Sequence, residues 1–118
     1  MWRIKYLKYS TEMKIALAQL NYTIGDIDGN ANLIIEAVRR AEAEAADLVL
    51  FEEYAVSGTP AYDLLRKTTF LTLCEEALER IAEACHHVTA IVGSPILTEN
   101  GAVSAAAVLR QGRIDEII

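Results

Sequence analysis

Two adjacent carboxylates, Glu52 and Glu53, follow directly on a short apolar run. Residues 48–51 read Leu-Val-Leu-Phe, and a turn with Gly58 and Pro60 comes after the acids. This pattern predicts a buried strand that ends on a carboxylate at the rim of a sheet. A carboxylate held above apolar surroundings is suited to act as a general base. The alternative is a strand that simply ends at the surface, where acids are common.

The two cysteines and the two histidines are further candidates for chemistry. Cys74 and Cys85 fall on the apolar stripe of one predicted helix. This placement favours buried packing thiols over a nucleophile, and it makes a disulfide between them unexpected. His86 and His87 follow where that helix should end, a position at which histidine suits the helix dipole. A catalytic pair or metal site needs convergence in space, so no metal site is predicted.

Gly25 and Gly29 lie in a predicted loop between a strand and a helix. Loops of this kind cradle phosphates in some proteins, but neither the GxGxxG nor the Walker pattern is present. The two glycines are therefore interpreted as turn residues, and Asn30 as the residue that caps the following helix.

Two crossover units followed by a meander are predicted to position these residues. Hydrophobic periodicity and turn residues give strands over 14–20, 47–51, 90–93, 103–109 and 113–118, and helices over 30–45 and 69–85. The strand over 90–93 is expected to end at Ser94-Pro95, and a hairpin turn is expected over 98–101. The order is β-α-β-α-β-β-β, an α/β fold whose early strands are parallel.

Length and composition narrow the class of protein. The chain has 118 residues, of which 53% are hydrophobic, enough for one small domain. Its net charge of −6 argues against nucleic acid as a partner. No apolar run approaches the length of a membrane span, so no membrane association is expected. Nothing in the cysteine usage indicates an oxidising compartment, and the cytoplasm is the expected location.

Residues 1–12 differ from the rest of the chain, being rich in basic and aromatic residues. They contain no continuous apolar core of the kind that a secretory signal needs. We interpret them as an N-terminal extension or a misassigned start, with an extra strand as the alternative, and residues 13–118 as the domain.

The segment around the two acids resembles the first catalytic motif of the nitrilase superfamily of carbon–nitrogen hydrolases. In that family an apolar strand leads to Phe-Pro-Glu and then to a Gly-Tyr-Pro turn. Residues 51–53, Phe-Glu-Glu, align with the first motif, and residues 57–60, Ser-Gly-Thr-Pro, with the second. Asp-Leu-Leu at 63–65 and the segment 13–30 are similar to the glutaminase domains of glutamine-dependent NAD synthetases. The resemblance spans residues 13–114.

This resemblance implies a fold and a set of partners. Residues 13–118 would be a partial carbon–nitrogen hydrolase domain, the first half of a nitrilase-like four-layer α-β-β-α sandwich. The remainder of that domain and a separate synthetase domain would be its missing partners, and a homo-oligomer is expected. The amidase half would need no cofactor, whereas the absent synthetase domain would use ATP and Mg.

The resemblance also implies a reaction, the hydrolysis of glutamine or another small amide by a Glu, a Lys and a Cys. Glu53 takes the place of the family's Glu, the general base. Neither Lys14 nor Lys67 matches the family's Lys motif, and the chain stops at Ile118, just short of the place where that Lys would be expected. Neither cysteine matches the nucleophile. The 118-residue chain alone is therefore predicted to be inactive, and the ammonia would serve NAD synthesis in the intact enzyme.

Three residues depart from the family pattern. Glu52 stands in place of Pro, and on an extended backbone its side chain should point away from that of Glu53. Thr59 stands in place of Tyr near the substrate pocket and is the candidate substrate-binding residue. Ser104 replaces the usual Asn in the strand after the hairpin.

Two alternatives to a glutaminase remain. One is another amidase of the superfamily, acting on a small linear amide. The other is a catalytically inactive nitrilase-like module used for assembly, which the departures and the missing Lys and Cys permit. A doubly wound binding domain outside the family would need a ligand loop that the sequence does not offer.

Overall fold

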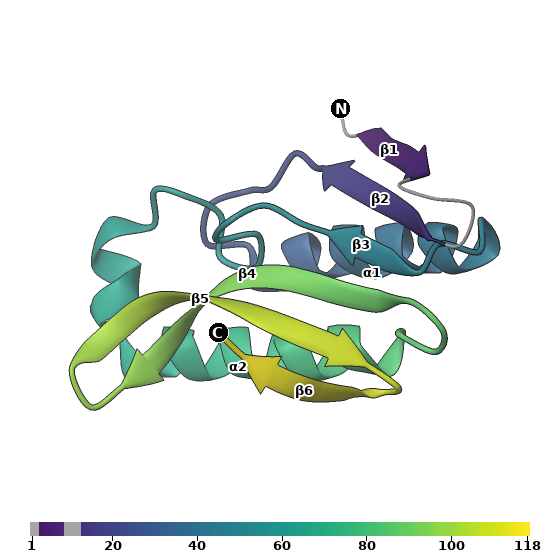
Figure 1. Ribbon diagram of the computed structural model, residues 1–118. Coiled ribbons are helices and arrows are strands. Elements are labelled where there is room, and N and C mark those ends of the chain that lie inside the picture. The colour runs from purple at the N-terminus through teal and green to yellow at the C-terminus, as the bar shows by residue number, and fades with distance from the viewer. Residues whose placement is uncertain (1–2, 9–12) are drawn as a thin grey trace.

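The computed structural model describes residues 3–8 and 13–118, which form one six-stranded sheet and two α-helices (Figure 1). The elements in chain order are β1 (Arg3–Lys8), β2 (Lys14–Gln19), α1 (Ile27–Ala43), β3 (Leu48–Leu50), the 3-10 helix η1 (Tyr62–Arg66), α2 (Thr68–Glu83), β4 (Thr89–Thr98), β5 (Gly101–Arg110) and β6 (Arg113–Ile117). The lateral order of the strands, β1-β2-β3-β4-β5-β6, follows the order of the chain.

The sheet combines the two crossover units and the meander that the sequence predicts. β2, β3 and β4 are parallel and are joined through α1 and α2. β4, β5 and β6 are antiparallel neighbours. The first hairpin turn is held by the Thr98 hydroxyl, which donates a hydrogen bond of 2.8 Å to the Gly101 carbonyl. The second turn uses positive φ at Gln111 and Gly112.

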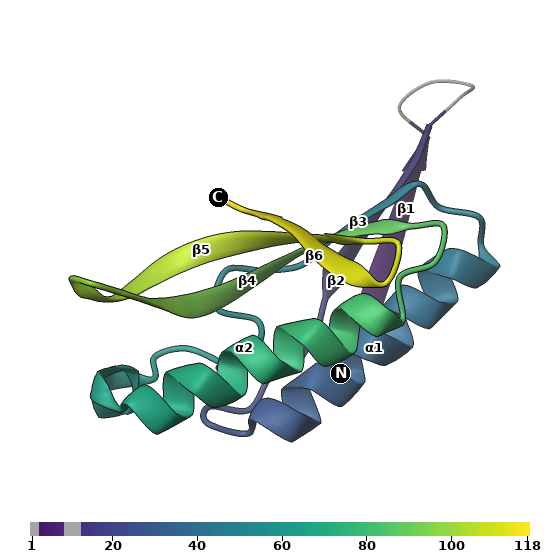
Figure 2. The ribbon, with the colours of Figure 1, turned by 90° about the horizontal axis from the view of Figure 1, so that it is seen from below.

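Both helices cover the same face of the sheet, and in the described part of the chain no element covers the other face (Figure 2). The apolar core lies between helices and sheet, where Ala16, Ala18 and Val49 of the strands are buried against the helix layer. Alternation along the strands therefore turns their neighbours outward. The uncovered face carries half-buried apolar residues at Ile15, Leu17, Leu48, Leu50 and Ile91.

β1 pairs with β2 along its whole length, from Arg3 opposite Gln19 to Lys8 opposite Lys14. Ile4 and Tyr6 pack against the core, and the Lys14 ammonium lies 5.1 Å from the centroid of the Tyr6 ring. Residues 3–8 thus form the extra strand that was the alternative interpretation of the segment 1–12. The other residues of that segment, 1–2 and 9–12, lie outside the described residues.

The start of α1 corrects the prediction that Asn30 caps the helix. Asp26 is the N-cap, and its carboxylate accepts a hydrogen bond from the Gly29 N–H at 3.0 Å. Asn30 lies inside the helix and is buried, with only 1% of its surface exposed. Aspartate and asparagine are both good caps, and the tertiary contacts of Asn30 place it inside the helix while Asp26 takes the N-cap position.

β4 does not end at Ser94-Pro95 as predicted but continues to Thr98. Proline is tolerated in a strand where its missing N–H faces no neighbour. The Ile91 and Gly93 carbonyls accept hydrogen bonds from Phe51 and Val56, on the side away from β5. The pleat places the Pro95 nitrogen on that same side, where β3 has already ended.

Neither described helix is long and apolar enough to cross a bilayer.

Candidate active site

The acidic pair lies in a tight turn that follows β3. The Phe51 N–H still donates to the Ile91 carbonyl of β4 at 2.9 Å, and the chain then leaves the sheet. Tyr54 adopts a positive φ of 57° and Gly58 one of 72°. The Gly58 N–H donates to the Tyr54 carbonyl at 2.8 Å, which closes the turn. We call residues 51–58 the elbow.

The elbow rests directly on Gly93 of β4. A Cβ at Gly93 would lie 2.7 Å from the Cα of Glu53 and would also collide with the Glu52 carbonyl oxygen. The Val56 N–H donates to the Gly93 carbonyl at 3.2 Å. Because only glycine permits this approach, β4 fixes the position of the Glu53 backbone.

The other side of the elbow is tied to the start of α1. The Asn30 side chain accepts from the Thr23 N–H at 2.8 Å, donates to the Thr23 carbonyl at 2.8 Å and donates to the Val56 carbonyl at 3.0 Å. The Gly25 N–H donates to the Ser57 carbonyl at 2.8 Å. The elbow is therefore held between the loop before α1 and strand β4.

Glu52 and Glu53 contact different strands. Glu52 Oε1 accepts a hydrogen bond of 3.2 Å from the Leu20 N–H, just beyond β2. Glu53 Oε2 accepts one of 2.7 Å from the Ser104 hydroxyl on β5. The side chains thus point apart, as the sequence predicts, and Glu52 has a structural partner of its own.

Glu53 lines a hollow of about 280 Å³ on the uncovered face of the sheet. The hollow has apolar walls and two polar side chains, and is lined by Phe51, Glu53, Ile91, Gly93, Ser104, Ala105, Ala106 and Ile118. No Lys or Cys is among these residues. The Glu53 hollow therefore presents one carboxylate, without the Lys and the Cys that the sequence resemblance implies for amide hydrolysis.

Thr59 is exposed and is not among the residues that line the Glu53 hollow. Its part in substrate binding stays a prediction. Ser104 and Gly93, in contrast, contact the candidate base, and sequence reasoning assigned neither of them to the site. Ser104 stood out in the sequence only because it replaces the usual Asn of the family pattern, and Gly93 did not stand out. The strand register that brings both residues to Glu53 cannot be read from the sequence.

The cysteines lie away from Glu53. Cys74 on α2 and Cys85 beyond its end are fully buried, in the helix-side core, as the apolar stripe predicts. Burial raises the pKa of both thiols to about 11, so both are protonated at neutral pH. A protonated thiol on the opposite side of the sheet cannot exchange a proton with Glu53.

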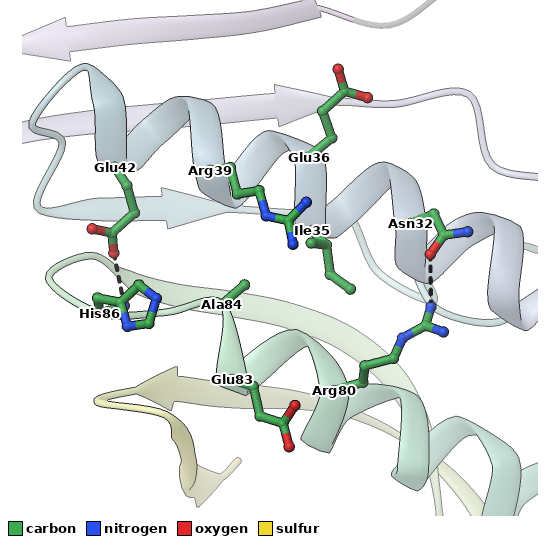
Figure 3. A pocket seen from close by; sticks show the side chains of 9 residues that line it. All are labelled: Asn32, Ile35, Glu36, Arg39, Glu42, Arg80, Glu83, Ala84 and His86. Atoms are coloured by element: carbon green, nitrogen blue, oxygen red, sulfur yellow. Dashed lines mark hydrogen bonds between the residues drawn. The ribbon is translucent and has the colours of Figure 1, made fainter.

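A larger hollow of about 920 Å³ lies between α1 and α2 (Figure 3). Two of its polar residues make structural contacts. Glu42 Oε1 on α1 accepts from the backbone N–H groups of His86, His87 and Val88, after the end of α2, at 2.7–2.9 Å. Arg80 donates to the Asn32 side-chain oxygen at 3.0 Å. These contacts are structural, and the smaller Glu53 hollow is the candidate site.

His86 and His87 thus contribute backbone N–H groups to a helix-terminus contact, and their side chains are exposed. Across the described residues, no three His, Cys, Asp or Glu side chains gather in a way that could hold a metal ion.

The comparisons with known proteins agree with this geometry. The profile of the carbon–nitrogen hydrolase family matches residues 14–113. The glutamine-dependent NAD(+) synthetase of Xanthomonas campestris is 44% identical over 104 residues, which are 87% of this chain and 19% of that enzyme. The chain thus spans about a fifth of the length of the curated relatives it matches.

Solved structures show the same fold. The glutamine-dependent NAD+ synthetase of Acinetobacter baumannii, solved with ADP, superposes with a TM-score of 0.83 at 33% identity, covering 90% of this chain and 20% of that one. An amidase from Nesterenkonia sp. AN1, solved as a double mutant with acrylamide, gives a TM-score of 0.75 at 19% identity, covering 94% of this chain and 44% of that one. The second likeness concerns the fold alone.

Proposed function

Because the chain belongs to the carbon–nitrogen hydrolase family, we propose that it supplies the general base for hydrolysing the side-chain amide of glutamine. The observation that carries this proposal is the place of Glu53. Its backbone is fixed against Gly93, its carboxylate faces an apolar hollow, and one carboxylate oxygen is held by Ser104. A carboxylate oriented in this way can accept a proton at its other oxygen.

In the proposed reaction, Glu53 takes the proton of a cysteine thiol. The thiolate attacks the amide carbon, and the C–N bond breaks as ammonia leaves with the proton that Glu53 returns. The resulting thioester is hydrolysed when Glu53 removes a proton from water and the water oxygen attacks the acyl carbon. The C–S bond breaks, glutamate leaves, and Glu53 returns the proton to the cysteine thiolate. The cysteine, and a lysine that stabilises the oxyanion, would come from the part of the enzyme that follows this segment.

We propose further that the ammonia serves NAD synthesis in the longer protein. The relatives named above are glutamine-dependent NAD(+) synthetases, and this chain matches about a fifth of their length. A separate domain using ATP and Mg would consume the ammonia. Because both cysteines are free thiols, we also propose that the protein works in the cytoplasm.

A hybrid enzyme tests the proposal. The 118-residue chain is joined, in place of the matching segment, to the remainder of the Xanthomonas campestris enzyme. We expect the hybrid to release ammonia from glutamine and to make NAD with glutamine as the nitrogen source. The chain alone should release none, because base, nucleophile and oxyanion stabiliser act as a unit.

Two outcomes would favour the alternatives. Ammonia release from small linear amides but not from glutamine would indicate another amidase of the family. NAD synthesis with added ammonium salts but not with glutamine would indicate that this segment is an inactive module, since the rest of the hybrid would then be folded and active.

A further inference from the structure

The Glu53 side chain has one hydrogen-bond partner among the described residues, the Ser104 hydroxyl. The distance from Ser104 Oγ to Glu53 Oε2 is 2.7 Å, and the two residues are 51 positions apart. A bond of this length between a hydroxyl and a carboxylate is among the stronger hydrogen bonds in proteins. The contact therefore joins β5 to the elbow through the carboxylate of the candidate base.

Strand β4 positions the backbones of both residues in this contact. Ser104 pairs with Pro95 of β4, and Ala106, two residues further along β5, pairs with Gly93. Gly93 is also the residue against which the Cα of Glu53 rests. The sheet register thus sets the distance between the Ser104 backbone and the Glu53 backbone, before either side chain is considered.

The carboxylate itself is not positioned by packing. Glu53 is exposed, and a glutamate side chain has several freely rotating bonds. Serine has one such bond before its hydroxyl, so a serine on a paired strand is the more rigid partner. Its single hydroxyl proton is committed to Oε2. Oε1 is left to accept a proton from the nucleophile or from water.

We infer that Ser104 is a positioning residue, which holds the Glu53 carboxylate in the orientation that proton transfer requires. This inference rests on the proposed function. Ser104 does not itself exchange a proton with substrate; it acts through Glu53. Its removal should therefore slow the chemical step without weakening the binding of glutamine.

The test uses the hybrid enzyme with Ser104→Val and Ser104→Thr, which have nearly the same shape and differ in the hydroxyl. We expect Ser104→Val to lower kcat for glutamine hydrolysis about tenfold with KM changed less than about twofold, and Ser104→Thr to retain most of the rate. Val103→Thr, on the opposite face of the same strand, is the control and should change neither. NAD synthesis from ammonium salts should be the same in all of them.

A second comparison excludes a merely structural effect. In an enzyme that already carries Glu53→Gln, adding Ser104→Val should lower the rate no further, because the two residues act as one unit. If valine perturbs the fold and ammonium-dependent synthesis falls, Ser104→Ala, which only deletes the hydroxyl, replaces it in the comparison.

The outcomes separate this inference from the function on which it rests. If Glu53→Gln lowers hydrolysis at least about 100-fold while Ser104→Val and Ser104→Thr are equally active, or equally slow, the role of Ser104 is wrong and the proposed function stands. If Glu53→Gln leaves hydrolysis intact, the proposed function is wrong and the role of Ser104 falls with it.

Discussion

Glu52 and Glu53 are neighbours in the chain, yet each contacts a different strand. The Glu52 carboxylate accepts the N–H of Leu20 and so ties the elbow to the end of β2. The Glu53 carboxylate lies in the hollow on the other side of the elbow. The turn that follows β3 thus gives two adjacent acids different hydrogen-bond partners and different roles.

Replacing each acid by its amide tests whether Glu53 is the base and Glu52 a structural residue. In the hybrid enzyme, Glu53→Gln should lower glutamine hydrolysis at least about 100-fold, because an amide cannot take up a proton as the carboxylate does. Glu52→Gln should cost less than about threefold, since its carbonyl oxygen can still accept the Leu20 N–H. Ammonia release from glutamine is the measurement. Equal losses in the two variants would show that the base is wrongly assigned.

The candidate base could be found from sequence because everything that marks Glu53 is local: an apolar run, an acid and a turn. The residues that position Glu53 could not. Gly93 and Ser104 come from β4 and β5, and their relation to the elbow depends on strand register and on a close backbone approach. Neither is encoded in the sequence around the residue that it serves.

At the scale of elements, Asn30 shows how a helix can be fixed in place by one buried amide. Its side chain makes three hydrogen bonds that join α1 to the loop before it and to the elbow. Loss of the amide would remove the donor from the buried Val56 carbonyl and the acceptor from the Thr23 N–H, and an unsatisfied buried group is the costly way to lose a hydrogen bond.

We therefore expect Asn30→Ala to destabilise the hybrid by about 1–3 kcal/mol and to lower its thermal midpoint. The matched control is Asn32→Ala on the same helix, which removes an exposed hydrogen bond from Arg80 and should cost much less. Thermal denaturation of the two variants gives the comparison. A shift for Asn32→Ala as large as that for Asn30→Ala would contradict the assigned role.

Glu42 links α1 to the segment that follows α2, and we expect this contact to depend on pH. Partial burial acts to raise the pKa of Glu42, but the hydrogen bonds from the backbone N–H groups of Val88, His87 and His86, together with the charge of His87, outweigh it. The pKa therefore lies below its ordinary value of 4.5. A depressed pKa means that the contact stabilises the fold fully above that ordinary value and loses its effect as the pH falls through the folded pKa.

The thermal midpoint of the parent hybrid should accordingly exceed that of Glu42→Gln at pH 7, and the difference should shrink as the pH falls below about 4.5. Glu83→Gln, an exposed acid on α2, is the control and should show little difference at either pH. A gap between parent and Glu42→Gln that is constant over this range would exclude the carboxylate as its source.

Most elements of the fold could be predicted from the sequence. The helices and the strands of the meander follow from hydrophobic period, and the order of elements follows from the turns between them. The differences arise where tertiary contacts override local pattern. Pro95 continues a strand because β3 ends beside it, and Asn30 enters a helix because its side chain is needed elsewhere. The pairing of residues 3–8 with β2 likewise depends on the edge that β2 leaves open, which local sequence does not show.

At the scale of the whole molecule, the two layers leave one face of the sheet without a cover. Leu17, Leu50 and Ile91 stand side by side on it in successive strands. Leaving apolar area in contact with water costs about 25 cal/mol per Å². In addition, β6 lies at the edge of the sheet, where another strand can pair with it. We expect the isolated 118-residue chain to self-associate or aggregate through this face.

Sedimentation at low micromolar concentration tests this expectation. Leu17→Lys, on the uncovered face, should shift the chain toward the monomer by placing a charge where another copy would pack. Glu36→Lys, on the exposed side of α1, is the control and should leave the association unchanged. A stable monomer of the parent chain, with a cooperative thermal transition, would show that the uncovered face does not drive association.

The lateral order of the strands has a consequence for how the chain is made. Because the sheet order from β1 to β6 repeats the chain order, each strand pairs with the strand synthesised just before it. A sheet of this kind can grow at one advancing edge while the polypeptide leaves the ribosome, N-terminus first. The longest closures are the two crossovers, such as the 41 positions between Leu48 and Thr89, and the entropy cost of closing a loop grows only slowly with its length. In the described sheet, no strand has to insert between two strands that were synthesised before it. The elbow that carries Glu53 can therefore pack against Gly93 as soon as β4 has left the ribosome.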